Sequence, residues 1–314
     1  MIQINKSDLK NLANNHYKNL KNTLIRKLKR KHSPLYNFIK RELETIITAE
    51  PKDLNKLIIK KIPYKLRHKS QLKKIFNYDS FSKNYYGYGA YNLAKLLDIR
   101  VCPYCNRQYT FTVLIENGKT RAEFDHFFSQ SKYPYLALSF YNLIPSCHIC
   151  NSNLKGSENF SLSRNIHPYL EGYENEVRFK IHLRNKNKFK KSEIKNWFGI
   201  NFFNGAHKSF DIKIKVIKPT VAIQKKANNN IDVFLLENLY NEHKDYVIEL
   251  IQKAEVYQPE YVDWLFKEYG GKLFNSTNDV YRMLLSNYIL PEDFGKRVLS
   301  KFTRDISEEL GIIF

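Results

Sequence analysis

The sequence predicts an α+β protein that is mostly helical, with a small strand-strand-helix core between two helical regions. Apolar residues recur every three to four positions through much of residues 6–98 and 220–288, which is typical of amphipathic helices. Shorter alternating stretches near the middle of the chain indicate strands. We therefore expect a basic helical region over 1–100, the core over 101–170, and a β-hairpin followed by helices over 171–314.

The composition excludes several classes of protein. The chain has 314 residues, of which 43% are hydrophobic and 14% aromatic, which excludes a disordered tail and a fibrous repeat. No apolar run approaches the roughly 18–20 residues that cross a bilayer. The first residues lack the apolar centre of a signal peptide, so a cytoplasmic protein is expected.

Positive charge is concentrated at the start of the chain. The whole sequence has 52 Lys and Arg against 31 Asp and Glu, a net charge of +21. Residues 1–100 alone hold 23 basic and 7 acidic residues, a net charge of +16, whereas residues 251–314 carry −2. This asymmetry predicts a polyanion partner, with contacts from Arg26, Lys27, Lys29 and Arg30. Solvated helix faces and an anionic membrane surface are the alternatives.

The first half of the chain predicts helices and then a hairpin. Ser33 and Pro34 separate the first two helices as a stop and restart signal. Strands are expected over 107–115 and 120–125, because Asn117 and Gly118 form a typical hairpin turn between them. After Ser146 a short helix is expected to end at Gly156. The helices expected before the hairpin are 6–31, 34–49, 52–61, 68–77 and 89–98.

The second half predicts one strand pair and then helices. Strands are expected over 177–184 and 210–217, where apolar and charged residues alternate. The helices expected after them are 220–238, 240–256, 259–268, 277–288 and a terminal segment.

The four cysteines form two C-x-x-C pairs, Cys102 with Cys105 and Cys147 with Cys150. The pairs are 41 residues apart, more than the roughly 15–20 of a simple zinc ribbon, so a larger element must lie between them. Four thiolates close a tetrahedral shell, which predicts structural zinc. The alternatives are buried cysteines without metal, or a redox pair. His148 lies between the second pair and is left out of the shell.

The residues from Cys102 to Gly156 resemble the zinc-stapled branch of the HNH nucleases. The resemblance rests on the two cysteine pairs, Asp125-His126, Asn142-Leu143 and Cys150-Asn151-x-x-x-Lys155-Gly156, in that order. It implies a ββα-metal core that holds one divalent ion, Mg²⁺ or Mn²⁺, against a phosphodiester. It also implies that His126 is the general base, that Asp125 and Asn151 ligate the ion, and that Asn142 orients His126.

General chemistry agrees with these roles. A histidine accepts a proton from water near neutral pH, and a carboxylate and an amide oxygen suit a hard cation. Lys155 follows Asn151 by four residues, so on a helix both side chains would share a face and Lys155 would contact a phosphate. Arg107 is a second candidate for a phosphate contact. The loop between His126 and Asn142 departs from the commoner pattern, since it is aromatic and has no glycine.

Residues 165–169 resemble a short element that follows the core in nucleases of bacterial anti-phage systems, including Septu- and retron-type effectors. This resemblance implies a defence role and a partner ATPase or another subunit of a defence complex. His167 in this element is expected to be structural. The function expected is a metal-dependent endonuclease with DNA as its favoured substrate. The alternatives are a zinc-stabilised nucleic-acid-binding protein without catalysis and a nuclease that cuts RNA or tRNA.

Overall fold

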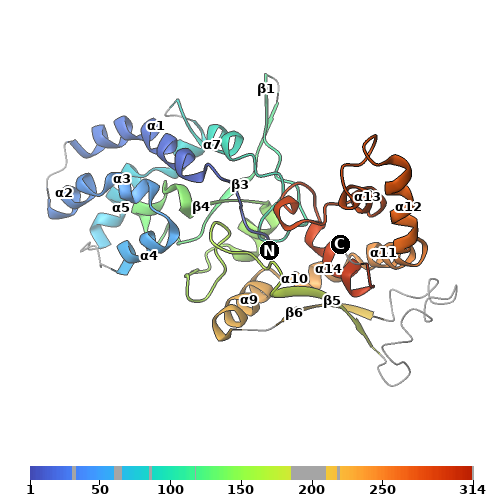
Figure 1. Ribbon diagram of the computed structural model, residues 1–314. Helices are drawn as coiled ribbons and strands as arrows, with labels where there is room; N and C mark the ends of the chain where they lie inside the picture. The colour runs from blue at the N-terminus through green and yellow to red at the C-terminus, as the bar shows by residue number, and fades with distance from the viewer. Residues whose placement is uncertain are drawn as a thin grey trace. The chain divides into compact units, whose positions relative to one another are not determined.

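The computed structural model describes residues 1–29, 33–59, 66–84, 87–116, 118–184, 210–217 and 220–312. Within these ranges, helices predominate over small two-stranded antiparallel sheets, so the chain is an α+β protein as predicted (Figure 1). The chain forms two compact units. Unit 1 comprises Met1 and Gln3–Gly172, and unit 2 comprises Ile2 and the residues from Tyr173 onward.

The first half of unit 1 is helical, as its apolar periodicity predicts. The longest helix, α1, buries Leu20, Leu24 and Leu28 along one face, which packs against the neighbouring helices of the unit. Ser33 caps the second helix by accepting a hydrogen bond from the Tyr36 amide at 3.5 Å. The predicted helix over 34–49 is divided at Glu42. The helices are α1 (Leu9–Lys29), α2 (Pro34–Arg41), α3 (Leu43–Thr48), α4 (Pro51–Ile59), α5 (Leu66–Ile75), α6 (Tyr78–Ser82) and α7 (Ala90–Leu97).

His16 is a fully buried polar residue on α1. Its Nε2 lies 2.9 Å from the Leu138 carbonyl oxygen, and its Nδ1 lies 3.0 Å from the Tyr88 hydroxyl. A carbonyl oxygen can only accept, so Nε2 carries the proton and Nδ1 accepts from Tyr88. Burial lowers the pKa of His16 to about 4, so the ring is neutral in the folded protein at pH 7.

Acid is therefore expected to destabilise unit 1 through His16. The pKa is about 4 in the folded state and about 6.5 in the unfolded state, so between these values the unfolded state binds the proton preferentially. The stability contributed by a neutral His16 is complete above about pH 6.5 and is lost, by about 3 kcal/mol, as the pH falls to 4. Urea unfolding at pH values from 4 to 7 measures the free energy of unfolding.

His16→Gln should make this free energy depend less on pH, and the control His182→Ala should not. The same pH dependence in wild type and both variants would show that His16 is not its cause.

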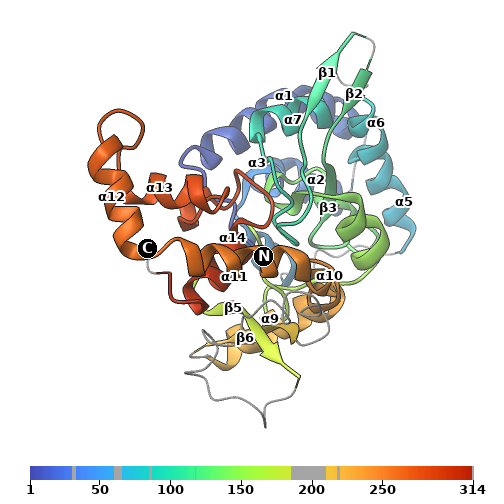
Figure 2. The same ribbon diagram turned by 90° about the vertical axis from the view of Figure 1, so that its right-hand side faces the viewer.

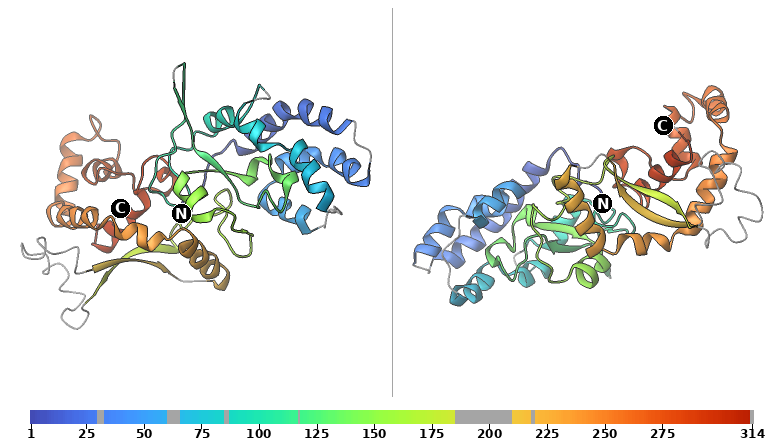
Figure 3. Two further views of the ribbon diagram at one scale, coloured as in Figure 1. Left: turned by 180° about the vertical axis from the view of Figure 1, so that it is seen from behind. Right: turned by 90° about the horizontal axis from the view of Figure 1, so that it is seen from below.

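The strands of unit 1 pair differently from the prediction. β1 (Val113–Ile115) pairs with β2 (Gly118–Thr120) in a narrow arm that projects beyond the helices of unit 1 (Figures 1, 2 and 3). β3 (Glu123–His126) pairs instead with β4 (Leu143–Ser146). The single hairpin predicted over 107–115 and 120–125 is therefore confirmed only for Val113–Ile115 with Gly118–Thr120, and it is wrong before Val113 and beyond Thr120. The reason is burial, because Phe124 packs in the interior with the fully buried β4, whereas β1 is exposed.

The helix after β4 confirms the predicted element but has an unusual geometry. η3 (Ile149–Lys155) is a π-helix, and the Gly156 amide donates to the Asn151 carbonyl at 2.9 Å, five residues back. π-helical turns are rare in proteins as a whole, and those that do occur are often found at functional sites. Gly156 ends the helix with a φ of +49°, a conformation that favours glycine. The order β3, β4, η3 is thus strand, strand, helix, and the loop between the strands contains the short turns η1 (Pro134–Leu136) and η2 (Phe140–Asn142).

Unit 2 contains the strand pair that the sequence predicts, β5 (Val177–Leu183) with β6 (Phe210–Val216). Its predicted helix over 220–238 is broken at Leu235, which has a φ of +45°. The helices of the unit are α9 (Val221–Val233), α10 (Leu236–Asn241), α11 (Lys244–Val256), α12 (Pro259–Tyr269), α13 (Thr277–Leu284) and α14 (Ser300–Glu309), with the short turn η8 (Pro291–Asp293).

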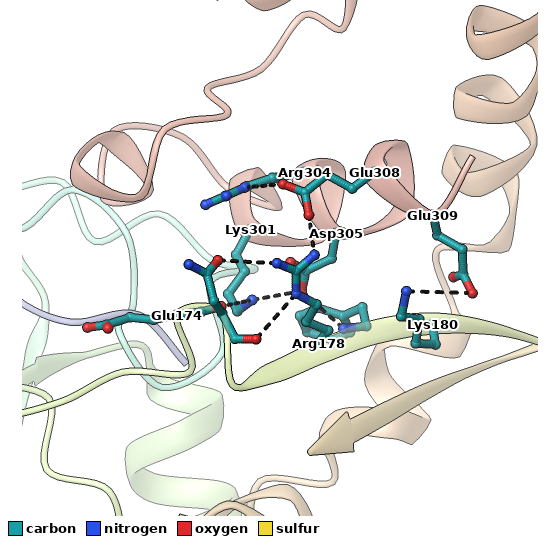
Figure 4. Close-up of polar contacts among 10 residues, drawn as sticks. Glu174, Arg178, Lys180, Lys301, Arg304, Asp305, Glu308 and Glu309 are labelled. Atoms are coloured by element: carbon teal, nitrogen blue, oxygen red, sulfur yellow. Dashed lines mark hydrogen bonds and ion pairs between the residues drawn. The ribbon is translucent and has the colours of Figure 1, made fainter. Parts of the chain in front are cut away.

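Side chains from two helices close both edges of this sheet. On β5, the Phe179 amide donates to Asp305 of α14 at 3.0 Å, and Lys301 ion-pairs with the same carboxylate at 2.7 Å (Figure 4). On β6, the Ile214 amide donates to Glu237 of α10 at 2.9 Å. Strand amides that would otherwise be open to another chain are therefore satisfied within unit 2.

Candidate functional site

The four cysteines lie together in unit 1, one pair on the turn that follows α7 and the other at the start of η3. The turn is held by two backbone hydrogen bonds, from the Cys102 amide to the Gln108 carbonyl at 2.9 Å and from the Asn106 amide to the Cys102 carbonyl at 2.8 Å. Asn106 adopts the left-handed conformation, with a φ of +52°, that this tight turn requires. All four thiols are free and buried.

The thiol geometry fits one tetrahedral metal ion. The four Sγ atoms lie within 4.8 Å of one another, and those of Cys105 and Cys147 are 3.9 Å apart. Zinc–sulfur bonds of about 2.3 Å place the sulfurs of a tetrahedral site about 3.8 Å apart. The predicted cluster is therefore confirmed as four buried cysteines close enough to bind a metal ion such as zinc.

Backbone hydrogen bonds stabilise negative charge on two of these sulfurs. The Arg107 amide donates to Cys105 Sγ at 3.4 Å, and the Cys150 amide donates to Cys147 Sγ at 3.5 Å. Hydrogen bonding from Cys102 lowers the pKa of Cys105 and Cys147, while burial raises the pKa of Cys102 itself. Thiolates that form in this buried cluster need a cation, which a metal ion supplies.

Asp125 is buried in a three-residue polar cluster with Lys155 and Tyr104. The Lys155 ammonium donates to Asp125 Oδ1 at 2.8 Å and to the His126 carbonyl at 3.0 Å. The Tyr104 hydroxyl donates to Asp125 Oδ2 at 2.6 Å. The side chains of Asp125 and Lys155 are each only 2% exposed. Both carboxylate oxygens thus have partners inside the protein, and Lys155 is not available to a phosphate in this structure.

Asn151 is oriented by a different acid. Its Nδ2 donates to Glu123 Oε2 at 2.8 Å, and Ser152 Oγ donates to the same oxygen at 2.8 Å. The exposed His148 lies 2.7 Å from Glu123 Oε1 through its Nδ1. Glu123 therefore ties β3 to the first turn of η3.

Asp125 and Asn151 do not fit as joint ligands of a divalent ion in this structure. Mg²⁺ requires oxygen ligands around an open, hydrated position. Asp125 is inaccessible and its charge is balanced by Lys155. The hydrogen bond from Asn151 Nδ2 to Glu123 leaves Oδ1 of Asn151 as the atom that could bind an ion, but Asp125 cannot join it. A divalent ion at Asp125 would first have to displace the Lys155 ammonium.

His126 lies on the opposite face of β3 from Asp125, since successive side chains of a strand alternate. Its Nε2 donates to the Ala137 carbonyl at 3.0 Å, and its ring meets the edge of Tyr78 at a centroid distance of 4.6 Å. A carbonyl only accepts, so the proton of the neutral ring is on Nε2. Nδ1 is then a lone-pair acceptor, and the side-chain hydrogen bond that His126 makes within the described part of the chain uses Nε2 alone.

Three consecutive carbonyls beside His126 are each held by a different side chain. Asn142 Nδ2 donates to the Leu136 carbonyl at 3.0 Å, His126 to that of Ala137, and His16 to that of Leu138. Asn142 Oδ1 also accepts a hydrogen bond from the Phe128 amide at 2.7 Å. Asn142 therefore acts on His126 through the loop between β3 and β4, with no direct hydrogen bond between the two side chains.

The other residues that the sequence singled out, the basic residues of α1 and His167, are not members of the three-residue polar cluster around Asp125. Arg26 and Lys29 are exposed on α1, whereas Lys27 reaches the carbonyls of Lys74 and Ile75 at 3.3 and 3.2 Å, at the end of α5. Arg30 lies outside the described residues. His167 is fully buried, and its ring packs on Phe127 at 4.2 Å between centroids.

Sequence reasoning did not single out Tyr104, Glu123 or His16. Glu123 had a detectable signal, because it stands two residues before Asp125 and so shares its face of β3. Tyr104 lies inside the first cysteine pair, which placed it near the cluster without indicating its partner. His16 carried no local signal, since its contact with Leu138 spans 122 residues.

Comparison with known proteins adds no relative: no family model matches the chain, and neither a curated protein nor a solved structure matches it. Among the described residues, the helices are all too short or too polar to cross a bilayer.

Proposed function

We propose that the chain is an endonuclease of the HNH class that hydrolyses phosphodiester bonds, with DNA as the favoured substrate. The order of the motif residues between Cys102 and Gly156 and the order β3, β4, η3 support this proposal. Zinc at the four cysteines is structural in this proposal, because four thiolates leave no open coordination position. A role in anti-phage defence, with a partner ATPase, is supported only by the resemblance of residues 165–169.

The observation that carries the proposal is the state of His126. Its Nε2 is committed to Ala137, which leaves Nδ1 as the acceptor. Burial lowers the pKa of His126 below its ordinary 6.5, so the ring is neutral at pH 7. A neutral imidazole with one nitrogen held and the other free is what a general base requires.

The proposed reaction is hydrolysis by water. Nδ1 of His126 takes a proton from a water molecule, and the oxygen of that water attacks phosphorus. The bond between phosphorus and the leaving oxygen breaks, and the leaving oxygen takes up a proton from solvent. Mg²⁺ or Mn²⁺, which the resemblance implies, would neutralise charge on the phosphate. Its ligands stay unassigned, because Asp125 and Asn151 do not fit that role in this structure.

The second candidate is a zinc-stabilised nucleic-acid-binding protein without catalysis. The buried pair of Asp125 and Lys155 favours it, because a metal-dependent nuclease needs accessible oxygen ligands. A nuclease directed at RNA or tRNA would differ from the first proposal in its substrate alone.

His126→Ala is expected to lower the rate of cleavage by about 10²–10⁴, because it removes the proton acceptor. The measurement is incubation of wild type and variant with plasmid, linear duplex, single-stranded DNA and tRNA, with Mg²⁺, with Mn²⁺ or with neither. His182→Ala, in unit 2, is the control and should cut like wild type. Equal rates for wild type and His126→Ala reject the assigned base. Binding without cleavage of any substrate supports the second candidate.

A further inference from the structure

An exposed apolar stripe begins before β1 and continues along it into the arm formed by β1 and β2. Tyr109, Phe111, Val113 and Ile115 alternate along one extended segment and are 46, 49, 44 and 65% exposed. Residues two apart in an extended chain face the same side, so these four side chains share one side of the segment, while Leu114, 54% exposed, faces the other. Val113 and Ile115 lie on β1, in the arm that projects away from the body of unit 1 (Figure 2), and Tyr109 and Phe111 precede that strand.

The two aromatic residues of the stripe already form a stack. The rings of Tyr109 and Phe111 have centroids 4.6 Å apart and planes inclined by 15°. About half of the surface of each residue is open to solvent, so the pair is accessible to another molecule. A flat ring of another molecule can extend such a stack, since offset parallel stacking is a preferred aromatic geometry.

The charge around the stripe favours an anionic partner. Arg107 precedes the stripe in the chain, and Glu116 is the single acid of the arm. Lys119 pairs with Leu114 across the hairpin, so Lys119 and Arg121 face the other side of the arm from Val113 and Ile115. There both cations lie over the ring of Tyr91, at 5.7 and 5.2 Å from its centroid. Residues 1–172 carry 29 basic and 12 acidic side chains, a net charge of +17. A basic protein surface would be repelled here, and a polyanion attracted.

We propose that the stripe binds an unpaired nucleic-acid strand, with bases stacked on Tyr109 and Phe111 and the phosphate backbone running beside Arg107. Flat bases and a phosphate backbone together match an aromatic platform on a unit of net charge +17, as in proteins that bind single strands. Duplex DNA hides the faces of its bases, so it is not the ligand of this platform. This inference rests on the proposed function in one respect, namely that the ligand is a nucleic acid.

The test is binding of a labelled single strand of about 15 nucleotides and of the matching duplex. The full chain is used in the His126→Ala background and without added Mg²⁺, so that cleavage plays no part. Tyr109→Ala with Phe111→Ala is expected to weaken single-strand binding by about tenfold or more. Duplex binding and the salt dependence should change little, because the phosphate contacts remain.

Unit 2 offers a matched control. Tyr261 and Trp264 also form an exposed stack, with centroids 5.8 Å apart and exposed fractions of 42 and 49%. Tyr261→Ala with Trp264→Ala should leave single-strand binding unchanged. Two conservative variants separate stacking from folding: Tyr109→Phe should bind like the parent, and Phe111→Leu should bind more weakly with unaltered zinc content and melting temperature.

Two outcomes overturn the inference. The first is that Tyr109→Ala with Phe111→Ala leaves the affinity for the single strand unchanged. The second is that this double variant loses equal affinity for the single strand and the duplex. Either result would assign the stripe to another role, such as a protein interface. Failure of the proposed nuclease function is distinct: binding that depends on the arm, without cleavage by the wild type under any condition, removes the nuclease and retains the platform.

Discussion

Cys147→Ser is expected to abolish metal binding at the four-cysteine cluster and to unfold the segment from the first cysteine pair to η3. The binding free energy of structural zinc is about 10–16 kcal/mol at pH 7 in small zinc domains. The whole stability of a domain is about 5–15 kcal/mol, so loss of this one interaction is decisive. Both cysteine turns end in this cluster, and β3 lies between them. Zinc per chain, measured by atomic absorption, and thermal melting of the variant check the result.

The control for this experiment lies in the same turn. Gln108 holds Cys102 through its backbone carbonyl, and its side chain is exposed, so Gln108→Ala should keep full zinc and the wild-type melting temperature. Treating the wild type with a chelator should reproduce the effect of Cys147→Ser, and added zinc should reverse it. One zinc per chain with unchanged melting in Cys147→Ser would show that the cluster is not a structural metal site.

Lys155→Met is expected to destabilise unit 1 by about 3–5 kcal/mol, because it leaves the buried carboxylate of Asp125 without its cation. The double variant Asp125→Asn with Lys155→Met removes both charges together and should recover most of that loss. Urea unfolding of the wild type, both single variants and the double variant gives the coupling free energy. Additive losses would show that the two groups do not stabilise each other.

The same variants decide whether a divalent ion competes with Lys155. Millimolar Mg²⁺ or Mn²⁺ should leave the melting temperature of the wild type unchanged and raise that of Lys155→Met, where the carboxylate lacks a partner. Asp125→Asn with Lys155→Met should not respond. If the wild type is itself stabilised by Mg²⁺ and Asp125→Asn removes that effect, Asp125 binds the ion despite Lys155, and the ligand assignment from the resemblance is restored.

Several features could be predicted because they depend on neighbours in the chain. The apolar spacing of Leu20, Leu24 and Leu28 defines the buried face of α1, and the C-x-x-C spacing brings each pair of thiols to one turn. The left-handed Gly156 ends η3, as predicted. The pairing of β3 could not be predicted from its local turn signal, since the partner strand begins 20 residues after Glu123 and was selected by burial of Phe124.

The sequence by itself determined most of the helices and the cysteine cluster, because spacing along the chain is sufficient to specify them. Only the tertiary structure decided what the side chains of Asp125 and His126 do. It buried Lys155 against Asp125, and it fixed the proton of His126 on Nε2 through a loop that is itself held by Asn142 and by His16 of α1. It also left the stripe on the arm exposed. The physical reason is that burial and charge balance arise from contacts between distant segments, which no local pattern records.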